Sequence, residues 1–148
     1  MKGKKILSFI ATVLCMVAIF LFSSQTGSDS ARVSSGVHKV LNFISLFKVI
    51  PIRKVAHFSL YFLLFLLINS FVNNFIKSNI KCYIISIAVS ILYAITDEYH
   101  QTFVTGRSGC FKDVCIDTLG VLIALLVYNI FLYFRNKKRK GSDTCVYE

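Results

Sequence analysis

The chain has 148 residues, of which 55% are hydrophobic and 16% are charged, and its 17 Lys and Arg against 7 Asp and Glu give a net charge of +10. Soluble domains carry roughly 25% charged residues, so this composition excludes an ordinary water-facing surface. One Pro and seven Gly also exclude a collagen-like or linker-rich chain. A small integral membrane protein remains, with a positive charge that needs an explanation.

Four uncharged segments approach the roughly 20 apolar residues that a helix needs to cross a bilayer. The predicted spans cover about residues 6–24, 55–75, 80–98 and 115–134. Backbone groups in lipid must be satisfied internally, and the sequence lacks the alternating segments of a transmembrane barrel, so the spans are predicted to be helices. We therefore expect an all-α integral membrane protein, with a four-helix bundle over residues 1–134 and a basic cytoplasmic tail over 135–148.

The first span follows three lysines, a pattern that it shares with secretory signal peptides. No clear small-x-small cleavage site follows at Phe22-Ser23-Ser24-Gln25, so we expect an uncleaved helix. Residues 25–54, between the first two spans, carry apolar residues at helical spacing, namely Val33, Val37, Val40, Leu41, Ile44 and Phe47. This pattern predicts a short amphipathic helix at the outer surface, and an ordinary helix packed on the bundle fits it equally well.

The Lys and Arg residues beside the spans predict the orientation, because positive charge accumulates on the cytoplasmic side. With both termini inside, ten of these residues lie on the cytoplasmic side and seven on the outer side. A basic cluster after the fourth span decides the orientation, because it is hard to translocate and is attracted to anionic inner-leaflet lipid. The cluster consists of Arg135, Lys137, Lys138, Arg139 and Lys140. This basic cluster has no interleaved aromatic residues, so no nucleic-acid partner is expected, and an oligomer stays open.

In this orientation, polar residues from three spans lie on the outer side. The second span begins with Arg53, Lys54, His57 and Tyr61, the third ends with Asp97, Glu98, His100 and Gln101 before Arg107, and the fourth begins with Asp113 and Asp117. Ionisable groups at membrane depth usually face the bundle interior and mark function, so we expect one outward-facing site. The alternative is that Arg53 or Arg107 only fastens helices through ion pairs and that His57 is an ordinary hydrogen-bonded histidine.

These motifs resemble the VanZ-like family, whose founding member is associated with teicoplanin resistance. The resemblance rests on Arg53-Lys54-x-x-His57-Phe58-x-x-Tyr61, on Asp97-Glu98-x-His100-Gln101-x-Phe103-x-x-x-Arg107, and on Asp113 followed by Asp117-Thr118-Leu119-Gly120. It implies a VanZ-like transmembrane domain in the cytoplasmic membrane of a bacterial cell, with a contribution to resistance against glycopeptide antibiotics. Relatives often carry Asn at the position of Asp117, so we expect Asp117 to be protonated or salt-bridged in this chain.

The chemistry of the expected site divides into two groups of residues. The catalytic candidates are the residues whose side chains can act as acids or bases, namely His57, Asp97, Glu98 and His100. The expected ligand-binding residues are Arg53, Lys54, Tyr61, Gln101, Arg107, Asp113 and Asp117, since Arg presents a bidentate fork to an anionic headgroup. The spacing matches no metal signature, so no metal site is predicted, and the question of a cofactor stays open.

The sequence thus predicts a site that recognises or modifies an anionic cell-envelope lipid or a lipid-linked precursor. A different class of function is also compatible with it, namely a non-catalytic membrane adaptor or binding protein that limits antibiotic access to lipid-anchored precursors. Whether the protein is an enzyme stays open. A transporter is a weaker interpretation, because no pair of broken, inverted-repeat helices is visible.

Overall fold

Four helices build the protein in the computed structural model, which describes residues 2–26 and 52–143. They are α1 (Lys2–Ser23), α3 (Ile52–Val72), α4 (Asn79–Gln101) and α5 (Phe111–Asp143). Each contains a segment that is long and apolar enough to cross a membrane. The prediction of an all-α, four-span membrane protein is confirmed. Most of the segment predicted to form an outer amphipathic helix lies outside the described residues.

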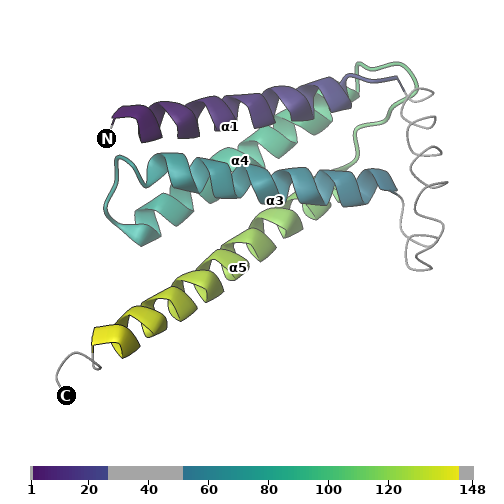
Figure 1. The fold of residues 1–148 in the computed structure, drawn as a ribbon. Helices are drawn as coiled ribbons and strands as arrows, with labels where there is room; N and C mark the ends of the chain where they lie inside the picture. The colour runs from purple at the N-terminus through teal and green to yellow at the C-terminus, as the bar shows by residue number, and fades with distance from the viewer. Residues whose placement is uncertain (1, 27–51, 144–148) are drawn as a thin grey trace, which may run out of the picture.

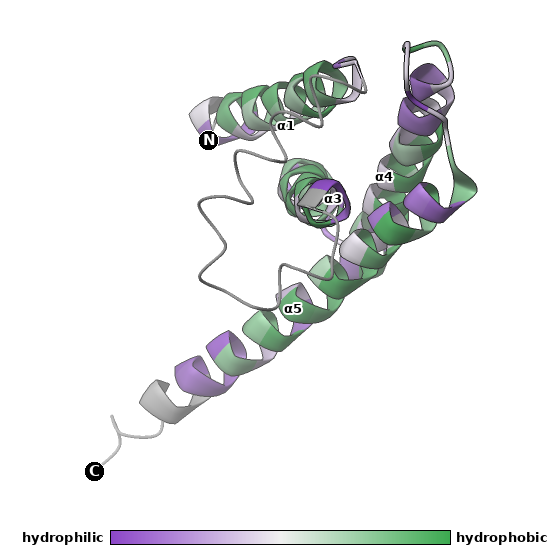
Figure 2. Ribbon diagram, turned by 90° about the vertical axis from the view of Figure 1, so that its right-hand side faces the viewer, coloured by the Kyte–Doolittle hydropathy of each residue, from purple (hydrophilic) through white to green (hydrophobic). Residues whose placement is uncertain are grey.

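The helices alternate in direction along the bundle (Figure 1). The end of α1, the start of α3, the end of α4 and the start of α5 therefore lie together, and we call this the site end of the bundle. Helix α3 is central, because it packs on α1, α4 and α5. In Figure 2, which views α3 almost along its axis, α3 lies between α1 and α5. This alternation places the polar residues of three spans at the same end.

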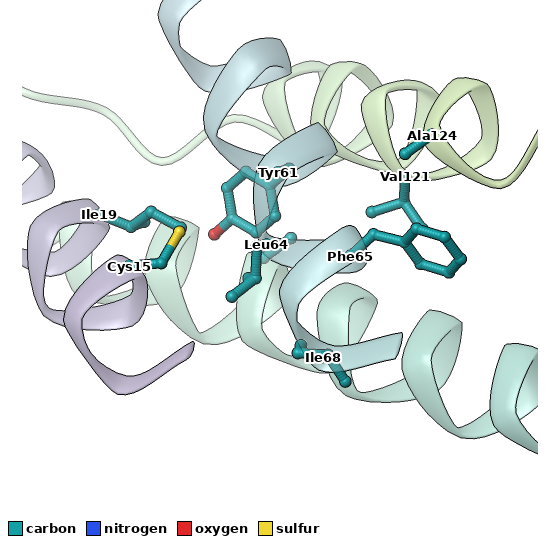
Figure 3. Close-up of a cluster of buried hydrophobic side chains, with 9 residues drawn as sticks. Cys15, Ile19, Tyr61, Leu64, Phe65, Ile68, Val121 and Ala124 are labelled. Atoms are coloured by element: carbon teal, nitrogen blue, oxygen red, sulfur yellow. The ribbon is translucent and has the colours of Figure 1, made fainter. Parts of the chain in front are cut away.

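The outer surface of the bundle is apolar and the interior is partly polar. Leu7 and Leu92 are 68% and 62% exposed, as suits side chains that face lipid. Part of the interior is a hydrophobic cluster in which Tyr61, Leu64 and Phe65 of α3 lie among side chains of the other helices (Figure 3). The rest of it is polar; the buried polar and charged residues are Thr12, Ser23, Asn69, Ser86, Ser90, Asp97, Glu98, Gln101 and Asp117. Hydrophobicity therefore holds the bundle in lipid, while packing and polar contacts hold the helices to one another.

One face of α4 leads from small residues to charged ones. Its buried residues at intervals of four are Cys82, Ser86, Ser90 and Ala94, all of them small. Small side chains let neighbouring helices approach closely in a membrane. Continuing the same face toward the site end brings Asp97, Glu98 and Gln101 into the bundle interior.

Helices α3 and α5 touch most closely at Gly120. A Cβ atom at Gly120 would lie 2.5 Å from the backbone oxygen of Phe58, so the contact admits only glycine without a shift. Phe58 follows His57 on α3, and Gly120 comes three residues after Asp117 on α5. The close approach thus brings the backbones that carry His57 and Asp117 together.

The helix ends differ from the ends of the predicted spans. Helix α3 ends at Val72 rather than near residue 75, and α4 continues past Glu98 to Gln101. Helix α5 begins at Phe111 rather than near residue 115, and it continues through the basic cluster to Asp143 instead of stopping near 134. An uncharged run measures the part of a helix that lies in lipid, whereas Arg and Lys are good helix formers and do not end a helix. Much of the segment predicted as a basic tail is therefore helical.

Candidate functional site

Gln101 connects four charged side chains at the site end. Its carbonyl oxygen Oε1 accepts hydrogen bonds from Arg53 and, at 3.4 Å, from Nη1 of Arg107. Its amide nitrogen Nε2 donates to Oδ2 of Asp97 at 3.2 Å and to Oε1 of Glu98 at 3.0 Å. The side chain is inaccessible to solvent. One neutral amide therefore joins a cationic pair to an anionic pair, and neither arginine makes a direct ion pair with a carboxylate among the described residues.

The two guanidinium groups keep hydrogen-bonding capacity that the described residues do not use. Arg107 donates from Nη2 to the backbone oxygen of Phe22 at 3.0 Å, which ties the α4–α5 loop to the end of α1. The Nε atoms of Arg53 and Arg107 are buried and have no partner within the described part of the chain. Burial, together with the neighbouring charge of Arg53, lowers the pKa of Arg107 from its usual value. An anion that accepts from both groups would relieve this unfavourable proximity.

The carboxylates are held on the other side of Gln101. Glu98 Oε2 accepts the backbone N–H of Cys110 at 2.9 Å. This bond requires the α4–α5 loop to lie against the end of α4. The approach is close at Gly109, where a Cβ atom would be only 2.4 Å from the backbone oxygen of Glu98. Asp97 Oδ1 is buried without a hydrogen-bond partner in the described residues. The loop thus fixes Glu98, whereas part of Asp97 stays unsatisfied.

His57 and Asp117 form a contact between α3 and α5. Nδ1 of His57 lies 3.3 Å from Oδ1 of Asp117, whose side chain is completely buried, while that of His57 is 14% exposed. Asp117, expected to be protonated or salt-bridged, therefore has an ion-pair geometry with a histidine. Tyr61, one helical turn after His57, is buried, and its hydroxyl has no partner within residues 2–26 and 52–143.

His100 takes part in a different contact. Its ring stacks on Phe20 of α1 with centroids 4.7 Å apart, and its Nε2 lies 3.2 Å from the hydroxyl of Ser24. Beside it is a pocket of about 190 Å³, lined by Phe20, Tyr93, Thr96, Asp97 and His100. Asp97 belongs both to this pocket and to the Gln101 network, so the two features adjoin each other.

Lys54 and Asp113 are the remaining candidates. Lys54 is exposed, and Asp113 is half-buried in the first turn of α5. Neither side chain has a hydrogen bond or ion pair in the part of the chain that the structure describes. The structure thus brings together Arg53, Asp97, Glu98, Gln101 and Arg107, places His57, Tyr61 and Asp117 on the adjoining α3 and α5, and leaves Lys54 apart.

Helix α1 contributes to the site in a way that the charged residues did not indicate. Its end supplies the Phe22 carbonyl to Arg107, and the ring of Phe20 and the hydroxyl of Ser24 to His100. A backbone carbonyl and an aromatic ring leave no specific sequence signal. The polar residues Ser23 and Ser24 at the end of the first span were the one available sign.

Comparison with known proteins identifies a family. The family model described as VanZ/LLP1 matches residues 8–132, which is most of the chain and includes every residue of the Gln101 network. No curated protein and no solved structure matches the chain.

Proposed function

The chain is a multi-pass membrane protein that belongs to the VanZ/LLP1 family, and from this premise we propose that its site end binds an anionic cell-envelope lipid or lipid-linked precursor. This binding contributes to resistance against glycopeptide antibiotics of the teicoplanin type. The site end faces the outside of the bacterial cytoplasmic membrane, and both chain termini face the cytoplasm. The basic cluster at the end of α5 then lies at the anionic inner leaflet.

The paired guanidinium groups carry this proposal. Arg53 and Arg107 converge on one oxygen atom of Gln101, and each retains an Nε–H donor without a partner in residues 2–26 and 52–143. Two like charges held this close at membrane depth are unfavourable unless an anion joins them. A phosphate or a pyrophosphate offers several oxygens in the geometry that guanidinium forks accept.

The adjoining pocket supports a lipid as the carrier of that anion. Phe20 and Tyr93 give part of its wall aromatic character, and it opens between α1 and α4. Asp97 lies between the pocket and the arginines, so a molecule with an apolar part and a charged part finds both surfaces side by side.

Resistance measurements on single alanine variants test the proposal. We expect Arg53→Ala, His57→Ala, Asp97→Ala and Arg107→Ala each to reduce the minimal inhibitory concentration of teicoplanin to that of cells without the protein. Lys81→Ala is the matched control, because it removes an exposed positive charge at the opposite end of the bundle. If all four variants kept full resistance at normal membrane abundance, the proposal that this site contributes to resistance would be wrong.

The alternative is a binding protein or adaptor without catalysis. It is favoured by one observation: His57 contacts α5 whereas His100 contacts α1, so the two histidines do not form one acid–base pair. Mass spectrometry of lipids that copurify with the protein addresses both interpretations. A bound anionic lipid that is lost from Arg107→Ala supports the site, and conversion of that lipid by the purified protein distinguishes an enzyme from an adaptor.

A further inference from the structure

Three potential metal ligands from three helices converge at the site end. His57 of α3, Glu98 of α4 and Asp117 of α5 each offer one ligand atom, and these atoms all lie within 4.8 Å of one another. Glu98 and Asp117 are buried, and His57 is largely buried. We propose that this trio binds one divalent transition-metal ion, Zn²⁺ or Mn²⁺.

The distances are compatible with one shared ion. Two ligand atoms that each lie about 2.1 Å from one ion are about 3.4 Å apart in tetrahedral geometry and at most about 4.2 Å apart. His57 Nδ1 and Asp117 Oδ1 are 3.3 Å apart, close to the tetrahedral value. The third ligand atom, within 4.8 Å, needs only a small side-chain movement.

Unsatisfied buried atoms give independent support. Both carboxylate oxygens of Asp117 are buried, and in the described residues neither has a hydrogen-bond partner beside the contact of Oδ1 with His57 Nδ1 at 3.3 Å. A buried carboxylate with an oxygen that has no partner is costly in a low-dielectric interior. A divalent cation would neutralise the two carboxylates with a neutral histidine as the third ligand, so the ion and its three ligands together would carry no net charge.

The donor set selects the type of metal. One imidazole and two carboxylates suit Zn²⁺ or Mn²⁺, whereas an all-oxygen site would suit Mg²⁺ or Ca²⁺. Structural zinc sites usually have four protein ligands, and three ligands leave a position for water or another oxygen. Glu98 also bonds to Gln101, so the ion would lie on the side of the network opposite the two arginines. The sequence showed no such site because residues 57, 98 and 117 belong to no short motif.

The test uses the full chain, purified in detergent without a histidine tag and stripped with EDTA. Isothermal titration with zinc chloride or manganese chloride should show one ion bound per chain for at least one metal. Asp117→Asn and Glu98→Gln should each weaken that binding at least tenfold, with an unchanged elution profile in size-exclusion chromatography. Cys115→Ser is the matched control, because it removes an exposed potential zinc ligand two residues from Asp117 and should keep the wild-type affinity.

Thermal unfolding separates loss of the metal from loss of the fold. The ion should raise the unfolding temperature of the wild type and leave that of Asp117→Asn unchanged. In EDTA, the difference in unfolding temperature between Asp117→Asn and the wild type measures the loss of the His57 contact alone. The proposal is overturned if neither metal binds with one ion per chain, or if Asp117→Asn and Glu98→Gln keep the wild-type affinity. Metal binding does not require the envelope lipid, so this result stands apart from the resistance test.

Discussion

Gln101 can join the two halves of its network only because it is a neutral amide. Its oxygen accepts from Arg53 and Arg107, and its nitrogen donates to Asp97 and Glu98. A carboxylate at this position would repel the acidic pair, and a cation would repel the arginines. The amide is therefore a positioning residue for all four charges.

Replacing Gln101 by Leu should destabilise the protein. The apolar side chain fills a similar space but leaves several buried charged groups without a partner, which costs about 1–3 kcal/mol for each group. We expect a clearly lower unfolding temperature in detergent. Fluorescence-detected size-exclusion chromatography of heated samples measures it.

Asn129→Leu is the matched control for this substitution. Asn129 is also an amide, but it is exposed and its carbonyl oxygen accepts a hydrogen bond from Tyr83 at the surface of the bundle. Its replacement should change the unfolding temperature little. Equal effects of the two substitutions would contradict the special role of Gln101.

The sequence indicated the polar residues of the site but not how they are arranged. Helical spacing relates Arg53 to His57 and Asp97 to Gln101, because each pair lies on one helix. It does not show that Arg53 reaches Gln101 or that His57 reaches Asp117, because these contacts depend on how three helices pack. Gln101 was one candidate among several, and its bridging role emerges only when both arginines are placed.

At the scale of helices, Gly120 controls how closely α3 and α5 pack. Gly120→Ala would place a Cβ atom 2.5 Å from the backbone oxygen of Phe58, which cannot rotate away. The helices must separate, at a cost of about 1–3 kcal/mol. We expect a lower unfolding temperature for this variant and, because His57 and Asp117 adjoin the contact, a weaker interaction between them.

Gly3→Ala is the control for the Gly120 substitution. It makes the same chemical change on α1, where a Cβ atom would have nothing within 4 Å. Its unfolding temperature should equal or exceed that of the wild type, since alanine favours a helix over glycine. A Gly120→Ala variant as stable as Gly3→Ala would show that the helix contact tolerates a methyl group.

The number and order of the helices followed from hydropathy, but their ends did not. Lipid requires long uncharged runs, and these runs are visible without any knowledge of packing. Helix ends depend on capping and on neighbouring segments, as when the loop backbone at Cys110 bonds to Glu98. The three residues of α4 beyond Glu98 include His100 and Gln101. A predicted span that ends at residue 98 therefore leaves two site residues outside the helix.

For the whole molecule, the distribution of basic residues predicts the orientation. Cys110 lies at the site end, is free and is partly exposed, whereas Lys81 lies at the opposite end. In a variant that keeps Cys110 as its single cysteine, we expect a membrane-impermeant maleimide to label intact cells. A cysteine-free variant carrying Lys81→Cys should be labelled only after permeabilisation. The reverse pattern would show that the site end faces the cytoplasm.

Helix α5 extends past the rest of the bundle at the end opposite the site (Figure 1). Its 33 residues are about 50 Å long, some 20 Å more than a bilayer core of about 30 Å. Figure 2 shows hydrophilic residues on the turns that precede its grey end. A soluble helical protein fused in frame to this end would share one continuous helix with the bundle. Such a rigid fusion would provide the mass outside the micelle that image alignment in electron cryomicroscopy requires, without touching the polar network about 40 Å away.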